Sequence, residues 1–186
     1  MQPVFTMQYG EFAVAEYLSS NIKDSSVFIP CSAQEKGIDL LLYRYKDNHN
    51  MTNTMQVKMS RSYKNNKWHY SLWFNRFDVP KNADWIILVG IYAKTPENIN
   101  AKTKETKWDT VMLAFTNEEM TQFMSEVKQK KDPSKDDRMF GFWYDENGNI
   151  YQERGCVSNR KMSKYLIEKR IAEISSSLKQ NRSRLP

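Results

Sequence analysis

The chain has few of the residues that build disulfide frameworks or thiolate metal sites. Its 186 residues include two cysteines and two histidines. Cys31 and Cys156 stand alone, without a CxxC motif or a nearby pair of histidines. We therefore interpret both as free thiols rather than metal ligands or nucleophiles. Internal repeats and low-complexity tracts are also lacking.

Long apolar runs are absent as well. The longest, Trp85–Ala93, is far shorter than the roughly 20 residues that a membrane-spanning helix needs. The sequence also begins without the basic start, apolar stretch and cleavage site of a secretory signal. These features predict a cytoplasmic protein that does not enter a membrane.

The composition is that of a packed globular protein, with 40% hydrophobic and 13% aromatic residues. The length suits one domain. A net charge of +6 favours polyanionic partners, although such a charge only modestly supports nucleic-acid binding. Residues 160–186 hold eight Lys or Arg and two Glu, so this segment carries the whole excess.

Periodicity predicts a first helix within residues 5–22, because apolar residues recur there at helical spacing. Runs rich in β-branched and aromatic residues predict strands. These runs are Val27–Pro30, Ile38–Tyr45, Thr52–Ser60, Trp68–Phe74, Asp84–Tyr92 and Thr110–Phe115. The run at Asp84–Tyr92 is almost uniformly apolar, which indicates a central strand covered on both faces. A polar loop at residues 46–50 should join the second and third runs.

The last third of the chain predicts a helix, a hairpin and a second helix. Thr116 and Glu119 form a capping box before the apolar stripe that starts at Met120. The Asn147-Gly148 pair predicts a hairpin turn between two aromatic runs. A basic helix should follow, from Asn159 to about Gln180.

The strongest functional signal lies in the predicted hairpin of the second and third strands. Asp39 stands in an apolar run, and a buried carboxylate is costly unless a metal ion, a Lys or an Arg compensates it. The period of two of a strand sends Gln56, Lys58 and Ser60 to one face of the sheet. One polar face beside a carboxylate is the outline of a metal-dependent nuclease site.

These residues resemble the PD-(D/E)XK nuclease superfamily, with its restriction-endonuclease-like and Holliday-junction-resolvase-like cores. That core carries an Asp, a hairpin, and then Glu or Gln, any residue, and Lys; here these are Asp39 and Gln56-Val57-Lys58, a Gln-x-Lys variant. Gly10-Glu11 resembles the pair that opens the superfamily's first helix. The resemblance covers residues 5–60, with a further strand at Asp84–Tyr92.

The resemblance implies an α/β fold, in which a restriction-endonuclease-like mixed β-sheet of about five strands is flanked by helices. It implies a single nuclease-like domain over residues 1–186. The core would span about 5–127, with a hairpin and a basic helix added at about 139–180.

The resemblance also implies Mg²⁺- or Mn²⁺-dependent hydrolysis of phosphodiesters, as an endonuclease for which DNA is favoured over RNA. Glu11 and Asp39 would hold the metal, with the Gln56 side chain and the backbone carbonyl of Val57 completing its shell. Lys58 would orient or deprotonate the attacking water.

Other interpretations of the same residues stay open. A neutral Gln56 attracts a metal less than a carboxylate does, so the fold could serve as a catalytically inactive nucleic-acid- or protein-binding module. Glu11 could instead interact with the helix dipole. Ser60 and Arg61 are candidate phosphate contacts, although a plain hydrogen bond at the strand end is as good an account of Ser60.

Two further segments are candidates for nucleic-acid binding. The basic C-terminal helix, with Lys179, Arg182 and Arg184 near its end, could follow a phosphate backbone, present a solvated face, or pair with its copy in a homodimer. The aromatic strand with Trp68, Tyr70 and Trp73 could stack on unpaired bases, although core packing is the stronger interpretation.

Overall fold

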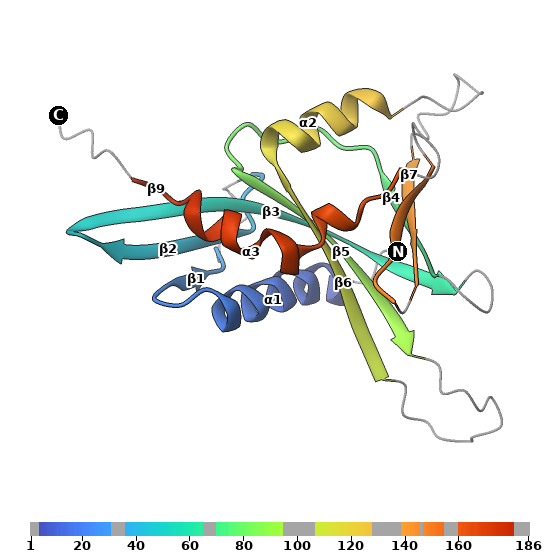
Figure 1. The fold of residues 1–186 in the computed structure, drawn as a ribbon, viewed down its shortest axis with the longest axis horizontal. Coiled ribbons are helices and arrows are strands. Elements are labelled where there is room, and N and C mark those ends of the chain that lie inside the picture. Colours follow the sequence, from blue (N-terminus) through green and yellow to red (C-terminus); the bar gives the residue numbers. More distant parts are fainter. Residues whose placement is uncertain are drawn as a thin grey trace.

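A computed structural model of the protein describes residues 4–30, 36–64, 70–94, 107–127, 139–145, 147–154 and 160–180. Within them the fold is mixed α/β, a mostly antiparallel sheet with three α-helices (Figure 1). No described helix combines the length and the apolar character that a bilayer span requires.

The α-helices are α1 (Val4–Asn21), α2 (Asn117–Glu126) and α3 (Ile167–Ser176), and a 3₁₀ turn covers Ser163–Tyr165. The strands are β1 (Ser26–Phe28), β2 (Leu40–Lys46), β3 (His49–Lys64), β4 (Tyr70–Asn75), β5 (Trp85–Lys94), β6 (Lys107–Thr116), β7 (Met139–Tyr144), β8 (Ile150–Arg154) and β9 (Lys179–Gln180). The predicted mixed α/β class is confirmed, but the expected sheet of about five strands is too small, because nine are described.

The 16-residue strand β3 holds the sheet together. It pairs antiparallel with β2 up to Met55, then parallel with β5 from Met55 to Arg61, and antiparallel with β4 from Ser62 to Lys64. The short β9 also joins β3, at Met51 and Thr52. The β3–β5 pair is the one parallel pair among the described strands.

A two-residue turn joins β2 to β3, in place of the predicted loop at residues 46–50. Asp47 and Asn48 both have positive φ, at 50° and 60°. Such a turn matches the right-handed twist of the strands, and Asp and Asn adopt positive φ more readily than most residues. Lys46 therefore pairs directly with His49, and the hairpin is longer than predicted.

Two apolar cores lie on opposite faces of β5. Ile87 and Val89 pack in the core covered by α1 and α3, whereas Ile86 and Leu88 pack in the core that α2, β4 and β7 close. In Figure 1, α2 lies above β3 and α1 below it. The prediction of a central strand covered on both faces is confirmed.

Local signals also predicted α2 and the β7–β8 hairpin. Thr116 and Glu119 form the predicted capping box, with both of its hydrogen bonds present. Gly148 has a φ of +76°, as the turn between β7 and β8 requires.

The first and the last predicted helices need correction. Helix α1 begins at Val4, so Gly10 and Glu11 lie inside it rather than at its opening. The prediction of one basic helix from Asn159 to about Gln180 is wrong, because α3 covers only Ile167–Ser176 and strand β9 follows at Lys179.

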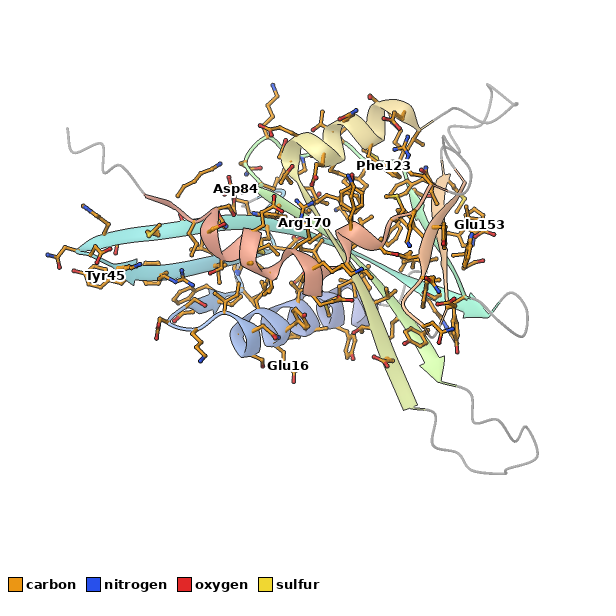
Figure 2. All side chains as sticks on the ribbon, viewed as in Figure 1. Glu16, Tyr45, Asp84, Phe123, Glu153 and Arg170 are labelled. Carbon is orange, nitrogen blue, oxygen red and sulfur yellow. The ribbon has the colours of Figure 1, made fainter. Side chains whose placement is uncertain are left out.

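Arg170 shows why the basic helix is not a uniformly exposed face. Its side chain is 8% exposed, and its guanidinium donates to both carboxylate oxygens of Glu119, at 3.0 and 2.9 Å. It lies between α3 and α2 (Figure 2), over the rings of Trp85 and Tyr165. Arg170 is therefore part of the packing between these helices and does not present its charge to solvent.

The pKa of Glu119 lies below its ordinary value of 4.5: burial opposes ionisation, but the hydrogen bonds from Arg170 and from the Thr116 backbone outweigh it. Because the folded-state pKa is lowered, the ionised carboxylate stabilises the fold above about pH 4.5. This stabilisation is lost as the pH falls through the lowered pKa.

We predict that Arg170→Met lowers the free energy of unfolding by about 2–3 kcal/mol, because it leaves the Glu119 carboxylate without its partner. The dependence of stability on pH below 4.5 should also flatten. Urea unfolding at pH 6 and pH 3.5 measures both effects. Lys169→Met, at the exposed neighbouring position of α3, is the matched control, and equal stability of the two variants would contradict the prediction.

Candidate functional site

One edge of β3 is open between two ladders. Pairing with β2 ends at Met55, and pairing with β4 begins at Ser62, so residues 56–61 pair with neither. The segment that follows β4 runs alongside this open stretch, and a cleft of about 380 Å³ lies between them. The lining residues are Glu11, Asp39, Val57, Lys58, Met59, Ser60, Trp73, Phe74, Asn75, Arg76, Phe77 and Met139.

Asp39 takes the place of a strand partner at this edge. Its Oδ2 accepts a hydrogen bond of 2.7 Å from the backbone N–H of Val57, and its own N–H donates to the carbonyl of Met55 at 2.8 Å. The N–H and C=O of one strand residue point to the same edge. The backbone carbonyl of Val57 therefore lies on the open edge beside the Asp39 carboxylate.

Glu11 reaches the cleft because α1 lies very close to β3. A Cβ at Gly10 would meet the Cβ and Sδ atoms of Met59 at 3.0 Å, so only glycine permits this approach without a shift. Burial, and then the negative charge of Asp39, raise the pKa of the Glu11 carboxyl above its ordinary value. Two carboxylates that repel each other in this way would be stabilised by a cation between them.

Lys58 points toward the opposite wall of the cleft. Its Nζ lies 5.6 Å from the centroid of the Phe77 ring, a distance at which the ring attracts the ammonium group. Ser60 lines the same cleft two residues further along the strand. The structure thus brings together Glu11, Asp39, Lys58 and Ser60, with the Val57 backbone between them.

Gln56 does not line the cleft with the other predicted site residues. Its side chain is 7% exposed, and its Oε1 atom has no hydrogen-bond partner among the described residues. The β2–β3 register ends with Leu40 opposite Met55, so Asp39 and Gln56 are the next residues along the two segments. A buried amide oxygen without a partner, next to an acidic residue, is an available ligand for a cation.

The donors fit one hard divalent cation with an incomplete protein shell. Two carboxylates, an amide oxygen and a backbone carbonyl are oxygen ligands of the kind that Mg²⁺ takes, and Mg²⁺ commonly retains several waters. The described part of the chain holds no group of three or more His, Cys, Asp or Glu side chains suited to a metal. Water and a substrate phosphate would therefore have to supply the remaining ligands.

The predicted nucleic-acid contacts outside the cleft are scattered. Arg61 is exposed on β3, just beyond the lining residues. Lys179 lies on β9, where its ammonium group is hydrogen-bonded to the Asp84 carboxylate. Arg182 and Arg184 lie outside the described residues.

Sequence reasoning missed the second wall of the cleft. Asn75 ends β4, Arg76 and Phe77 follow it, and none of the three belongs to a motif that would connect it with Asp39. Their position depends on where β4 departs from β3, which the hydrophobic pattern does not specify.

Comparison with family models, with curated proteins and with solved structures finds no match for this chain.

We predict that Gln56→Glu makes the thermal stability depend on Mg²⁺. A buried carboxylate without a partner should cost about 1–3 kcal/mol in EDTA, and a bound cation would remove this penalty. Melting temperatures with EDTA, Mg²⁺ and Mn²⁺ test the effect. The control is Gln152→Glu, at a fully buried Gln on β8, which should be destabilised without a metal response. Equal metal responses in the two variants would contradict a cation site at Gln56.

Proposed function

We propose that the protein is a Mg²⁺-dependent endonuclease that hydrolyses phosphodiester bonds, with DNA as the favoured substrate. The observation that carries the proposal is the cleft at the open edge of β3, which Glu11, Asp39 and Lys58 line together. Phosphodiester hydrolysis needs a cation, a positioned water and a positive charge near the phosphate. The two acids with the Val57 carbonyl could bind the cation, and the lysine could supply the positive charge.

The order of the elements supports the same proposal. Helix α1, strand β1, the Asp39 segment with β2, and the Gln-x-Lys strand β3 follow one another along the chain as in the superfamily that the motif resembles. Strand β5 lies parallel beside β3, as the next strand of the sheet. The finer assignment to a restriction-endonuclease-like core rests on this order together with the motif.

The residues proposed for the site have distinct roles. Glu11, Asp39 and the Val57 carbonyl would hold the cation in the cleft, and the buried Gln56 amide, which lies outside the cleft lining, is a further candidate ligand. A bound Mg²⁺ supplies positive charge to the phosphate and lowers the pKa of a coordinated water. Lys58 orients the attacking water and stabilises the charge that develops on the phosphate oxygens.

Arg76 is exposed and lines the same cleft. Its guanidinium suits a contact with a phosphate next to the scissile bond. The Asp39 carboxylate is held in place by the Val57 N–H, so one of its oxygens is already oriented before substrate binds.

A binding module without catalysis is the second candidate. The observation that favours it is the small number of acids, since the cleft has two carboxylates and Gln56 lies outside its lining. Such a module would bind nucleic acid in EDTA and would show no Mg²⁺-dependent cleavage.

We predict that Asp39→Asn and Lys58→Met each lower Mg²⁺-dependent cleavage of plasmid or oligonucleotide DNA by about 10²-fold or more. Asparagine retains an acceptor for the Val57 N–H. A loss of cleavage in Asp39→Asn would therefore result from the missing negative charge and not from a broken hydrogen bond at the edge of β3. Matched controls are Asp47→Asn and Lys46→Met at the exposed hairpin turn. Wild-type protein that binds DNA tightly but cleaves none in Mg²⁺ would favour the binding module.

The basic C-terminal segment remains a proposed phosphate contact. We predict that neutralising Arg182 and Arg184 together reduces the salt dependence of DNA affinity by about one unit of slope per lost phosphate contact. Lys179→Gln is a less direct test, because it also breaks the pair with Asp84. An unchanged slope in the double variant would remove these arginines from the interface.

A further inference from the structure

The sheet formed by β4, β7 and β8 has aromatic side chains on both faces. Phe74, Phe140 and Phe142 point into the core beneath α2. Because strand residues alternate between faces, Trp73 and Trp143 point to the opposite side, where both are half-buried.

The outward aromatic residues occupy nearby register positions on the three strands. Trp143 is opposite Tyr151 in the β7–β8 ladder, and their rings are stacked with centroids 4.5 Å apart and planes 18° apart. Trp73 is opposite Gly141, and its ring lies so close that a Cβ at Gly141 would be 2.9 Å from its Cε3 atom. We call Trp73, Trp143 and Tyr151 the aromatic strip.

The aromatic strip is continuous with the cleft. Trp73 belongs to both, since it lines the cleft that contains Asp39 and Lys58. The β3–β4 ladder ends with Ser62 opposite Leu72, so Arg61 and Trp73 are the next residues along the two strands. Arg61 and Arg76 therefore lie at the junction of strip and cleft, where a phosphate backbone passing from one to the other would meet positive charge.

We infer that the aromatic strip stacks the unpaired bases of a single-stranded DNA segment whose backbone enters the cleft. This inference deepens the proposed function and rests on it: the substrate would carry a single-stranded tail or flap beside the bond to be cleaved. Aromatic rings beside cationic residues are the usual platform for unpaired bases, because every base has a face that can stack. Bases within a duplex are already stacked on each other and offer no such face.

The test measures binding apart from cleavage. Asp39→Asn protein in EDTA is titrated against fluorescein-labelled single-stranded and duplex oligonucleotides, with fluorescence anisotropy as the readout. Adding Trp143→Ala should lower the single-strand affinity about 5- to 100-fold, the range for loss of one stacked base. Affinity for the duplex should stay the same, and Trp143→Phe should recover most of the loss.

Two further variants control for folding and for general surface effects. Tyr151→Ala removes the stacking partner of Trp143, so it tests the same strip if Trp143→Ala fails to fold. Tyr45→Ala removes another exposed aromatic residue, at the end of the β2–β3 hairpin far from β8 and Glu153 (Figure 2). Its single-strand affinity should equal that of the Asp39→Asn parent.

The outcomes separate this inference from the proposed function. If Trp143→Ala selectively loses single-strand affinity but the wild-type protein cleaves no DNA, base stacking on the aromatic strip is supported and the proposed hydrolysis is overturned. Mg²⁺-dependent cleavage together with unchanged single-strand affinity in folded Trp143→Ala would overturn the strip and leave hydrolysis standing. If the protein binds no oligonucleotide, single-stranded or duplex, base stacking on the aromatic strip is overturned as well.

Discussion

The hydrogen bond from the Val57 N–H to the Asp39 carboxylate marks the place on which the rest of the site depends. A strand must satisfy its backbone groups at both edges, and β3 loses its partner β2 after Met55. The carboxylate supplies an acceptor where the ladder stops. As a result, an acidic side chain is fixed at the open edge, and the neighbouring carbonyl remains directed into the cleft.

The two cores hold this edge in place from opposite sides. One fixes α1, and thereby Glu11, against β3 through the contact of Gly10 with Met59. The other fixes β4 and β7, which carry the second wall. Arg170 connects the two layers, because it joins α3 to the capping carboxylate of α2 across the edge of the sheet. Stability and site geometry therefore depend on the same contacts.

The sequence was most informative where a structure depends on adjacent residues. The capping box at Thr116 and the central strand β5 were both predicted, since each depends on local pattern. The ion pair of Arg170 was not predicted, because its partner Glu119 lies 51 positions away in the sequence. In the candidate site the motif identified the Asp39 side of the cleft. The wall with Phe77 depends on where two strands separate, which no short pattern records.

Both walls of the cleft are attached to the same strand. Asp39 stands at the end of the β2 ladder and Trp73 at the start of the β4 ladder, with residues 56–61 of β3 between them. The separation of the walls is thus a function of the curvature of one strand, supported on its far side by β5. A change in the bend of that stretch would move the Asp39 wall and the Trp73 wall relative to each other, although the two acids themselves lie outside β3, on α1 and just before β2.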